Sequence, residues 1–223
     1  MKTVPKESIR NAVIMTMIAV IVTVLVAVVD VQPVGVEGTD LGFASINTAF
    51  FNKFGESHTF YIISKLAGFI CFAVAGGFGI FFLIQFFQRK DLCKVDRNLT
   101  VLVMLYLVTA IIYLLFDKIA IINYRPVLRD KGLESSYPST HAMIAYVVMV
   151  SAVDQWNIYI KNEKLLTAAT AASFLVLALV IVSRILSGVH WITDIIGGIL
   201  IADMLIAWYR AVLTRQTAAG LNE

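Results

Sequence analysis

Residues 99–116 read LTVLVMLYLVTAIIYLLF, a run in which no side chain is charged. A helix rises about 1.5 Å per residue, so about 20 apolar residues cross the hydrocarbon core of a bilayer, which is about 30 Å thick. Charged residues flank the run, with Arg97 before it and Asp117 and Lys118 after it. This stretch therefore predicts a helix that spans a membrane.

Five more apolar runs lie on either side of this one. Together they predict six transmembrane helices, at residues 12–29, 61–87, 99–116, 141–153, 165–182 and 191–209. The run at 141–153 is the weakest, because Asp154 follows it and only an extension toward residue 160 makes it long enough to span. All four prolines lie outside the runs, as intact helices prefer. We predict an all-α fold, a polytopic membrane helix bundle that forms a single integral membrane domain over residues 1–223.

The composition also indicates a membrane protein. Of the 223 residues, 59% are hydrophobic and 15% are charged, whereas soluble domains have about 45–50% apolar and about 25% charged residues. These values exclude a disordered chain and a disulfide-stapled secreted scaffold, and they argue against a water-soluble domain. The net charge of +3 comes from short clusters between the apolar runs, so no nucleic-acid partner is expected. Cys71 and Cys93 are expected to stay unpaired, because the first lies inside a predicted span and the second in a predicted cytoplasmic loop.

The basic residues predict the orientation of the bundle, because cytoplasmic segments carry an excess of Lys and Arg. With the N-terminus in the cytoplasm, the inner side receives 11 of the 18 Lys and Arg residues, namely Lys2, Lys6, Arg10, Arg89, Lys90, Lys94, Arg97, Lys161, Lys164, Arg210 and Arg215. We therefore expect both termini in the cytoplasm and a plasma-membrane location, such as a bacterial inner membrane. The first run exceeds the usual length of a signal-peptide core and lacks a small-x-small cleavage site, which predicts a retained anchor.

Three polar segments are expected to meet at the outer boundary of the membrane. Alternating topology brings together DKIAIINYRP (117–126), YPSTH (137–141) and SRILSGVHWITD (183–194). These segments contain three basic side chains, two of the three histidines of the chain and the carboxylate that follows the last histidine. Ionisable groups at membrane depth are costly and usually mark a functional site.

The two histidines have different expected roles. His190 and Asp194 are four residues apart, so they share one face if the last span begins near them. A carboxylate there can hold the imidazole tautomer and leave the other ring nitrogen as a nucleophile. His141 follows a predicted helix start and is suited to protonate a leaving alkoxide.

The same three segments also predict an anion site. Ser139 is a good N-cap residue, and the first backbone N–H groups of a helix bind anions. Lys118, Arg125 and Arg184 add three positive charges, two of them on planar guanidinium groups that suit phosphoryl oxygens. Together with the histidines, this cationic cradle predicts phosphoryl transfer through a phosphohistidine, with no metal and no cofactor.

The three segments, in this order and at these spacings, resemble the tripartite signature of the type 2 phosphatidic acid phosphatase (PAP2) superfamily. The matching residues are Lys118-x6-Arg125-Pro126, Pro138-Ser139-Thr140-His141 and Ser183-Arg184-x5-His190-x3-Asp194. The resemblance implies an all-helical membrane phosphatase in which His190 attacks phosphorus, Asp194 orients it and His141 protonates the leaving group. It also implies that Lys118, Arg125, Ser139, Arg184 and the backbone of Thr140 hold the phosphate. Thr140 stands where the family usually has glycine, but its backbone N–H is retained.

The expected function is hydrolysis of a phosphorylated membrane lipid at the outer face. Phosphatidic acid, phosphatidylglycerol phosphate and undecaprenyl pyrophosphate are all candidate substrates, and no residue pattern ranks them. A lipid phosphotransferase with the same site, or a non-catalytic lipid-phosphate binder or transporter, are the alternatives. The expected partners are therefore a phosphorylated lipid and the bilayer, and no pattern specifies an oligomeric state.

Other segments carry weaker expectations. Residues 30–58 form either a surface helix that covers the site or a loop folded onto the bundle. The helix glycines Gly76, Gly77, Gly79, Gly197 and Gly198 are expected to allow close helix packing. Asp203, nine residues after Asp194, is expected to be a hydrogen-bond partner in packing, and Lys65 either contacts a headgroup or extends to the lipid phosphates.

Overall fold

The computed structural model describes residues 6–128 and 132–219, with side chains as far as residue 214. Within these residues the ordered elements are α-helices and two short 3-10 turns, and no strand occurs. The helices are α1 (Lys6–Val28), α2 (Ala44–Phe54), α3 (His58–Arg89), α4 (Arg97–Lys118), α5 (Thr140–Tyr159), α6 (Glu163–Leu186) and α7 (Ile192–Ala219). The predicted all-α fold is therefore confirmed.

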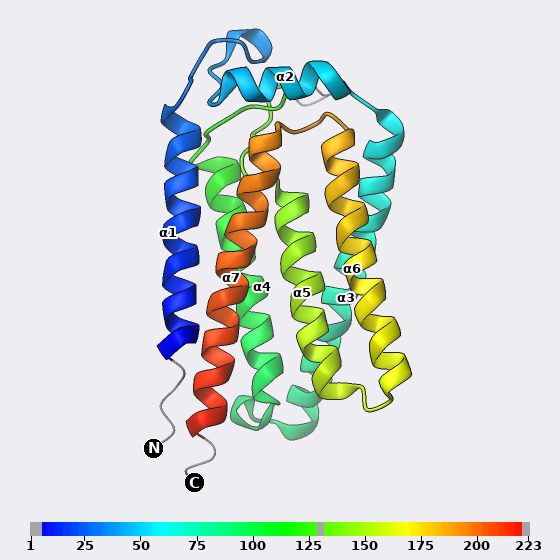
Figure 1. Ribbon diagram of the computed structural model, residues 1–223. Helices are drawn as coiled ribbons and strands as arrows, with labels where there is room; N and C mark the ends of the chain where they lie inside the picture. The colour runs from blue at the N-terminus through cyan, green and yellow to red at the C-terminus, as the bar shows by residue number, and fades with distance from the viewer. Residues whose placement is uncertain (1–5, 129–131, 220–223) are drawn as a thin grey trace.

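Six of these helices run alongside one another, and α2 lies across one end of the bundle (Figure 1). The start of α1 and the end of α7 lie at the opposite end. Each predicted apolar run corresponds to one of the six long helices. Five of them, α1, α3, α4, α6 and α7, are long and apolar enough to cross a membrane, whereas α5 falls below that threshold.

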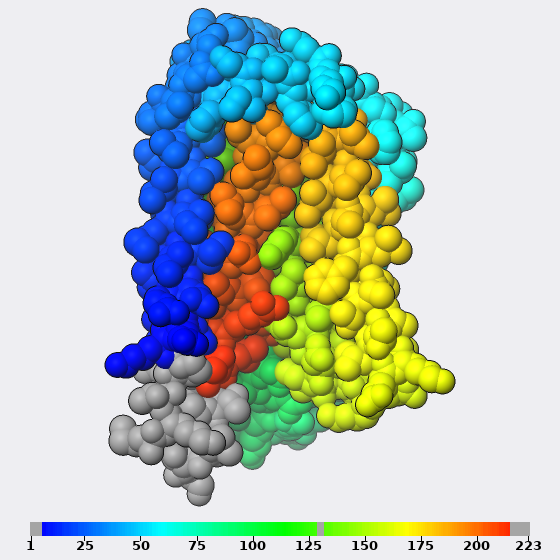
Figure 2. All heavy atoms as spheres, in the orientation of Figure 1, coloured from blue at the N-terminus to red at the C-terminus, as the bar shows by residue number. Residues whose placement is uncertain are grey.

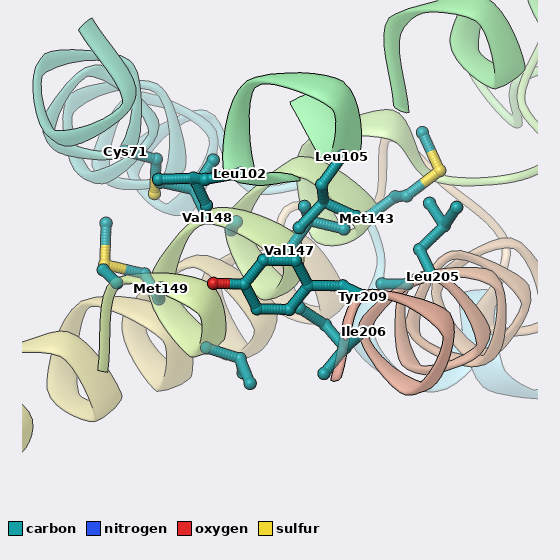
Figure 3. Close-up of a cluster of buried hydrophobic side chains, with 14 of the residues drawn as sticks. Cys71, Leu102, Leu105, Met143, Val147, Val148, Met149, Leu205, Ile206 and Tyr209 are labelled. Atoms are coloured by element: carbon teal, nitrogen blue, oxygen red, sulfur yellow. The ribbon is translucent and has the colours of Figure 1, made fainter. Parts of the chain in front are cut away.

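α5 is one of the two most enclosed helices in the bundle, together with α7, which explains why it can be less apolar. Ten of its 20 residues are buried, against three of the 23 residues of α1. Side chains from α3, α4 and α7 converge on α5, among them Cys71, Leu102 and Tyr209 (Figure 3). A helix that faces other helices instead of lipid can carry polar groups, provided that they are hydrogen-bonded.

A network of polar side chains joins the helix ends farthest from α2. The backbone N–H of Asp96 donates to Gln85 Oε1 (2.9 Å), and Asp96 Oδ2 accepts from Gln85 Nε2 (2.8 Å) and the Tyr159 hydroxyl (2.9 Å). Burial raises the pKa of the Asp96 carboxyl, but donors from Gln85, Arg89 and Tyr159 outweigh it and lower the pKa below its usual value. The ionised carboxylate therefore ties α3, α4 and α5 together at neutral pH.

The expectation for Asp203 is confirmed, because Asp203 Oδ1 accepts a hydrogen bond from the Tyr146 hydroxyl (3.0 Å).

The space-filling view shows that α2 and the chain before it cover their end of the bundle, while α5 is visible between α6 and α7 (Figure 2). The basic residues predicted for the inner side lie toward the uncovered end, although Lys2 and the side chain of Arg215 fall outside the described part.

Two glycines of α7 permit its close approach to the start of α5. A Cβ on Gly198 would lie 2.6 Å from the carbonyl oxygen of Ser139, and one on Gly197 would overlap the ring of Tyr137. The packing role predicted for these glycines is therefore confirmed. The same prediction is wrong for Gly76, Gly77 and Gly79, where a Cβ would meet nothing within 4 Å. Those three glycines lie on parts of α3 that have no close neighbour.

We expect Gly198→Ala to separate α7 from α5 and to lower the free energy of unfolding by roughly 1–3 kcal/mol, the usual cost of overpacking. The added methyl group meets a backbone oxygen, which cannot rotate away. Thermal unfolding in detergent measures the change. Gly76→Ala is the matched control and should be neutral or stabilising, since alanine is the better helix former. Equal loss in both variants would contradict the close contact.

Candidate active site

The three motif segments meet at the end of the bundle that α2 covers. A cavity of about 130 Å³ lies between them, and Arg125, Tyr137, Thr140, His141 and His190 contribute to its walls. At about 30 Å³ per water molecule this is room for roughly four waters, which suits a phosphoryl group. The sequence prediction that the three segments lie together at one end is therefore correct.

His190 lies in the turn before α7, and its ring is held through Nδ1. Nδ1 is 3.1 Å from the backbone carbonyl oxygen of Ser136 and 3.1 Å from Ser136 Oγ. A carbonyl oxygen can only accept a hydrogen bond, so Nδ1 carries the proton. Nε2 is then the ring nitrogen with the lone pair, which is the tautomer that a nucleophilic histidine requires.

Asp194 is completely buried in the first turn of α7 and receives three donors. Its Oδ2 accepts from the Trp191 backbone N–H (2.9 Å) and from Ser136 Oγ, and its Oδ1 accepts from Asn123 Nδ2 (3.3 Å). The bond to Trp191 is the reciprocal half of a capping box, in which a carboxylate caps the helix start. Each motif segment, or the residues next to it, thus supplies a donor to one carboxylate.

The contact between His190 and Asp194 differs from the sequence expectation. α7 begins at Ile192, so His190 precedes the helix and the two residues do not share a helical face. His190 Nδ1 and Asp194 Oδ2 are 3.7 Å apart, which is too far for a hydrogen bond. The hydroxyl of Ser136 contacts both groups and lies between them.

His141 lies in the first turn of α5, where the helix dipole is positive. The charged and titratable groups around it are Arg184, His190, Arg125 and Lys65. An anion bound among these groups would compensate their positive charge. Lys65, for which the sequence allowed two roles, therefore lies near enough to His141 to act on it electrostatically. Its Nζ is 5.4 Å from the centre of the Tyr61 ring.

Ser139 occupies the predicted N-cap position of α5 but does not cap the helix. Its Oγ is buried and makes no hydrogen bond within the described part of the chain. A buried hydroxyl without a partner is costly unless a ligand or water supplies one. The hydroxyl is therefore available to bind a phosphoryl oxygen, and the backbone N–H of Thr140 follows it at the helix start.

The two arginines are held in different ways. Arg125 Nη1 pairs with Glu134 Oε2 at 3.1 Å, and the Arg125 backbone N–H donates to the Glu134 carbonyl oxygen. Arg184 is only 1% exposed, and its guanidinium carbon lies 5.6 Å from the centre of the Tyr61 ring. Such a cation–π contact helps to fix the orientation of a guanidinium.

Lys118 is not brought into the cavity. Its side chain is 73% exposed and its Nζ pairs with Asp117 Oδ2 at 2.8 Å. The last turn of α4 therefore directs Lys118 outward, whereas Asp117 contributes to the wall of the cavity. The phosphate-binding role of Lys118 stays a prediction.

α2 holds the start of α7 in place from above. Asn47 Nδ2 donates to Thr193 Oγ1 (2.9 Å), and Phe51 packs on Trp191 with ring centres 5.7 Å apart. At the start of α2, hydrogen bonds from the Ser45 backbone N–H and, to a smaller extent, from the Gln32 amide lower the pKa of Asp30. The ionised Asp30 carboxylate stabilises the first turn of α2. Of the two structures predicted for residues 30–58, the structure shows the helix that covers the site, which is α2.

The motifs indicated no role for several side chains that the structure places here. These include Ser136, Asn123, Glu134 and Tyr61, which contact predicted site residues. Asn47 contacts Thr193, which is next to Asp194. Ser136 and Asn123 lie next to or within the quoted segments, so proximity to the motifs is the only signal that could have indicated them. Among residues whose side chains are described, no three His, Cys, Asp or Glu side chains group closely enough to hold a metal ion.

Comparison with known proteins supports the family expected from the motifs. The sequence model of the PAP2 superfamily matches residues 116–218, which contain all three segments. The matched part, just under half of the chain, is similar to the PAP2 superfamily. Sphingosine-1-phosphate phosphatase 2 of Mus musculus is 35% identical over 92 residues, covering 38% of this chain. The matched segment spans 24% of that relative's length.

The fold also has a solved counterpart among PAP2 proteins. The crystal structure of a transmembrane PAP2 type phosphatidylglycerolphosphate phosphatase from Bacillus subtilis superposes with a TM-score of 0.66. The match covers 92% of this chain and 96% of that chain at 16% sequence identity. At this identity the likeness shows that the two chains share a fold.

The pair between Arg125 and Glu134 yields a prediction, because the Glu134 carboxylate competes with any bound phosphate for the guanidinium. We expect Glu134→Gln to strengthen binding of phosphate or vanadate by roughly two- to fivefold, the range of a partly exposed ion pair. Inhibition of turnover by the two anions measures this. Glu37→Gln makes the same charge change away from Arg125 and should have no effect. Weaker anion binding in Glu134→Gln would show that Glu134 positions Arg125 instead of competing for it.

Proposed function

We propose that this protein is a membrane lipid phosphatase that hydrolyses a phosphomonoester or diphosphate lipid at the outer face of the membrane. One observation carries the choice of a lipid substrate. A second cavity, of about 400 Å³, is lined by apolar residues of α3, α4 and α5, including Phe72, Ala75 and Ala110. Tyr113, Thr140 and His141 line both cavities.

The two cavities match the two parts of a phosphorylated lipid. The smaller one is lined by Arg125, His141 and His190, among others, and suits the phosphate, whereas the larger one suits a hydrocarbon chain. Because His141 belongs to both walls, the bond between phosphate and lipid would lie beside it. This is the position from which a general acid protonates a leaving oxygen.

The family supports the same activity. The matched relative is named as a phosphatase of sphingosine 1-phosphate, and the structural neighbour as a phosphatase of phosphatidylglycerolphosphate. Neither name selects the lipid for this chain. Phosphatidic acid, phosphatidylglycerol phosphate and undecaprenyl pyrophosphate therefore remain candidate substrates.

The proposed reaction has two steps. His190 Nε2 forms a bond to phosphorus as the bond from phosphorus to the leaving oxygen breaks, and His141 donates its proton to that oxygen. A water molecule then attacks the phosphohistidine, His141 accepts the proton of the water, and phosphate leaves as the P–N bond breaks. Asp194 stabilises the positive imidazole of the intermediate.

The phosphoryl oxygens would be held by fixed donors throughout. Arg125, Arg184, the Ser139 hydroxyl and the Thr140 backbone N–H are proposed to bind them, with Lys118 at the rim. Because this positive charge comes from side chains, we propose that the reaction needs no metal ion. The excess of Lys and Arg at the uncovered end of the bundle supports a cytoplasmic location for that end and an outer location for the site.

Trapping the phosphohistidine intermediate distinguishes the roles of the two histidines. With ³²P-labelled lipid substrate and excess EDTA, the unmodified protein should release phosphate and carry acid-labile, base-stable label. His190→Ala should carry no label with any substrate, because the nucleophile is absent. His141→Ala should lose roughly 10²–10⁴-fold in turnover of a lipid, the usual contribution of a general acid.

An aryl phosphate is the control for the second variant. p-Nitrophenyl phosphate has a good leaving group, so His141→Ala should slow its phosphorylation step much less. If His190→Ala still carried label and His141→Ala did not, His141 would be the nucleophile and His190 the general acid. Labelled acceptor lipid in place of free phosphate would indicate a phosphotransferase, and neither product would indicate a binder or transporter.

The larger cavity can be tested by filling it. Ala75→Phe should lower kcat/KM for long-chain phosphatidic acid by roughly 10–100-fold, which corresponds to the cost of about 1–3 kcal/mol for overpacking. Turnover of p-nitrophenyl phosphate, which has no chain, should stay close to that of the unmodified protein. Ala73→Phe adds the same ring to an exposed position of the same helix and is the matched control. Equal losses for both substrates in Ala75→Phe would argue against a chain in this cavity.

A further inference from the structure

Ser136 occupies a position that none of the motif residues accounts for. Its side chain is buried, with the residue 2% exposed, and it lies between the nucleophile and the carboxylate. Its Oγ is 3.1 Å from His190 Nδ1 and forms a hydrogen bond to Asp194 Oδ2. The direct separation of Nδ1 from Oδ2 is 3.7 Å, so the serine hydroxyl offers the shorter connection.

The hydrogen-bond chemistry gives this connection a direction. His190 Nδ1 carries a proton because the Ser136 carbonyl oxygen, also 3.1 Å away, can only accept. An ionised carboxylate likewise only accepts, so the single hydroxyl hydrogen of Ser136 points to Asp194. Because both Ser136 oxygens are 3.1 Å from Nδ1, the one Nδ1 hydrogen is shared between the carbonyl oxygen and a lone pair of Oγ. This arrangement includes the chain Nδ1–H to Oγ–H to Oδ2.

We propose that Ser136 is a positioning residue that couples Asp194 to His190. The proposal rests on the proposed function, in which His190 is the nucleophile. When Nε2 bonds to phosphorus, the imidazole becomes positive and Nδ1–H becomes a stronger donor. The two hydrogen bonds through the hydroxyl then allow the Asp194 carboxylate to stabilise the positive imidazole. Each proton stays on the atom to which it is bonded.

The surrounding contacts hold Ser136 in register for this role. Its backbone N–H donates to the carbonyl oxygen of Asn123 (2.9 Å), and the Asn123 side chain binds the second oxygen of Asp194. The next residue, Tyr137, is buried and its hydroxyl contacts Thr23 of α1 at 2.7 Å. The hydroxyl of Ser136 is thus fixed by the fold before any substrate binds, which a preorganised site requires.

A double-mutant cycle tests whether Asp194 acts through Ser136. Ser136→Ala removes the hydroxyl but keeps the backbone carbonyl. We expect kcat to fall roughly 10–100-fold, by analogy with the loss of a hydrogen-bond partner of a metal-ligating histidine. KM and inhibition by vanadate should change little, because the phosphate-binding groups remain. Ser173→Ala, which removes another buried hydroxyl far along α6, should leave kcat unchanged.

The decisive comparison uses Asp194→Asn in both backgrounds. If the carboxylate acts through the hydroxyl, Asp194→Asn should cost much less in Ser136→Ala than in the unmodified protein. Full additivity of the two changes, or an unchanged kcat in Ser136→Ala, would overturn the proposal. Ser136→Cys keeps the volume with a weaker donor and gives the same cycle if the alanine variant does not fold. Failure of the proposed function is distinguishable, because the unmodified protein would then release no phosphate.

Discussion

The site depends on the need to satisfy one buried carboxylate. Asp194 is completely inaccessible, and an ionised group without partners in such a place is very costly. Its donors come from the turn before α7, from the segment after α4 and from the segment before α5. The stretches around Asn123, Ser136 and Trp191 are therefore bound to one carboxylate, and the cavity forms where they converge.

The helices differ in how much of their surface is buried by other helices: about half of α5 and of the apolar part of α7 is buried, and much less of α1, α3, α4 and α6. α5 carries His141 at its start and is surrounded by other helices along its length, so its polar residues can be hydrogen-bonded to neighbours. The outer helices are apolar because hydrocarbon cannot bind polar groups. The glycines of α7 let α5 start close to Asp194, so an enclosed helix also carries the candidate acid.

Much of the fold followed from apolar runs, because the thickness of a bilayer limits helix length and alternation of direction determines which ends meet. Side-chain direction did not follow. Lys118 and Asp117 are adjacent in one helical turn, and only the packed structure decides that Asp117 faces the cavity and Lys118 the exterior. The spacing of His190 and Asp194 suggested direct contact, but the helix begins between them and a serine from another segment lies there. That the whole chain forms a single domain stays a prediction.

The pairing of α1 with α7 has a consequence for how the protein is made. α1 packs chiefly against α7, with only three of its own residues buried. The ribosome completes α7 only after every other helix of the bundle. Until then, α1 lies in the bilayer without the helix against which it packs. Its almost uniformly apolar surface allows this, because lipid solvates such a helix as well as protein does. Since α7 also carries Asp194, insertion of the last helix and assembly of the candidate site are a single event during biosynthesis.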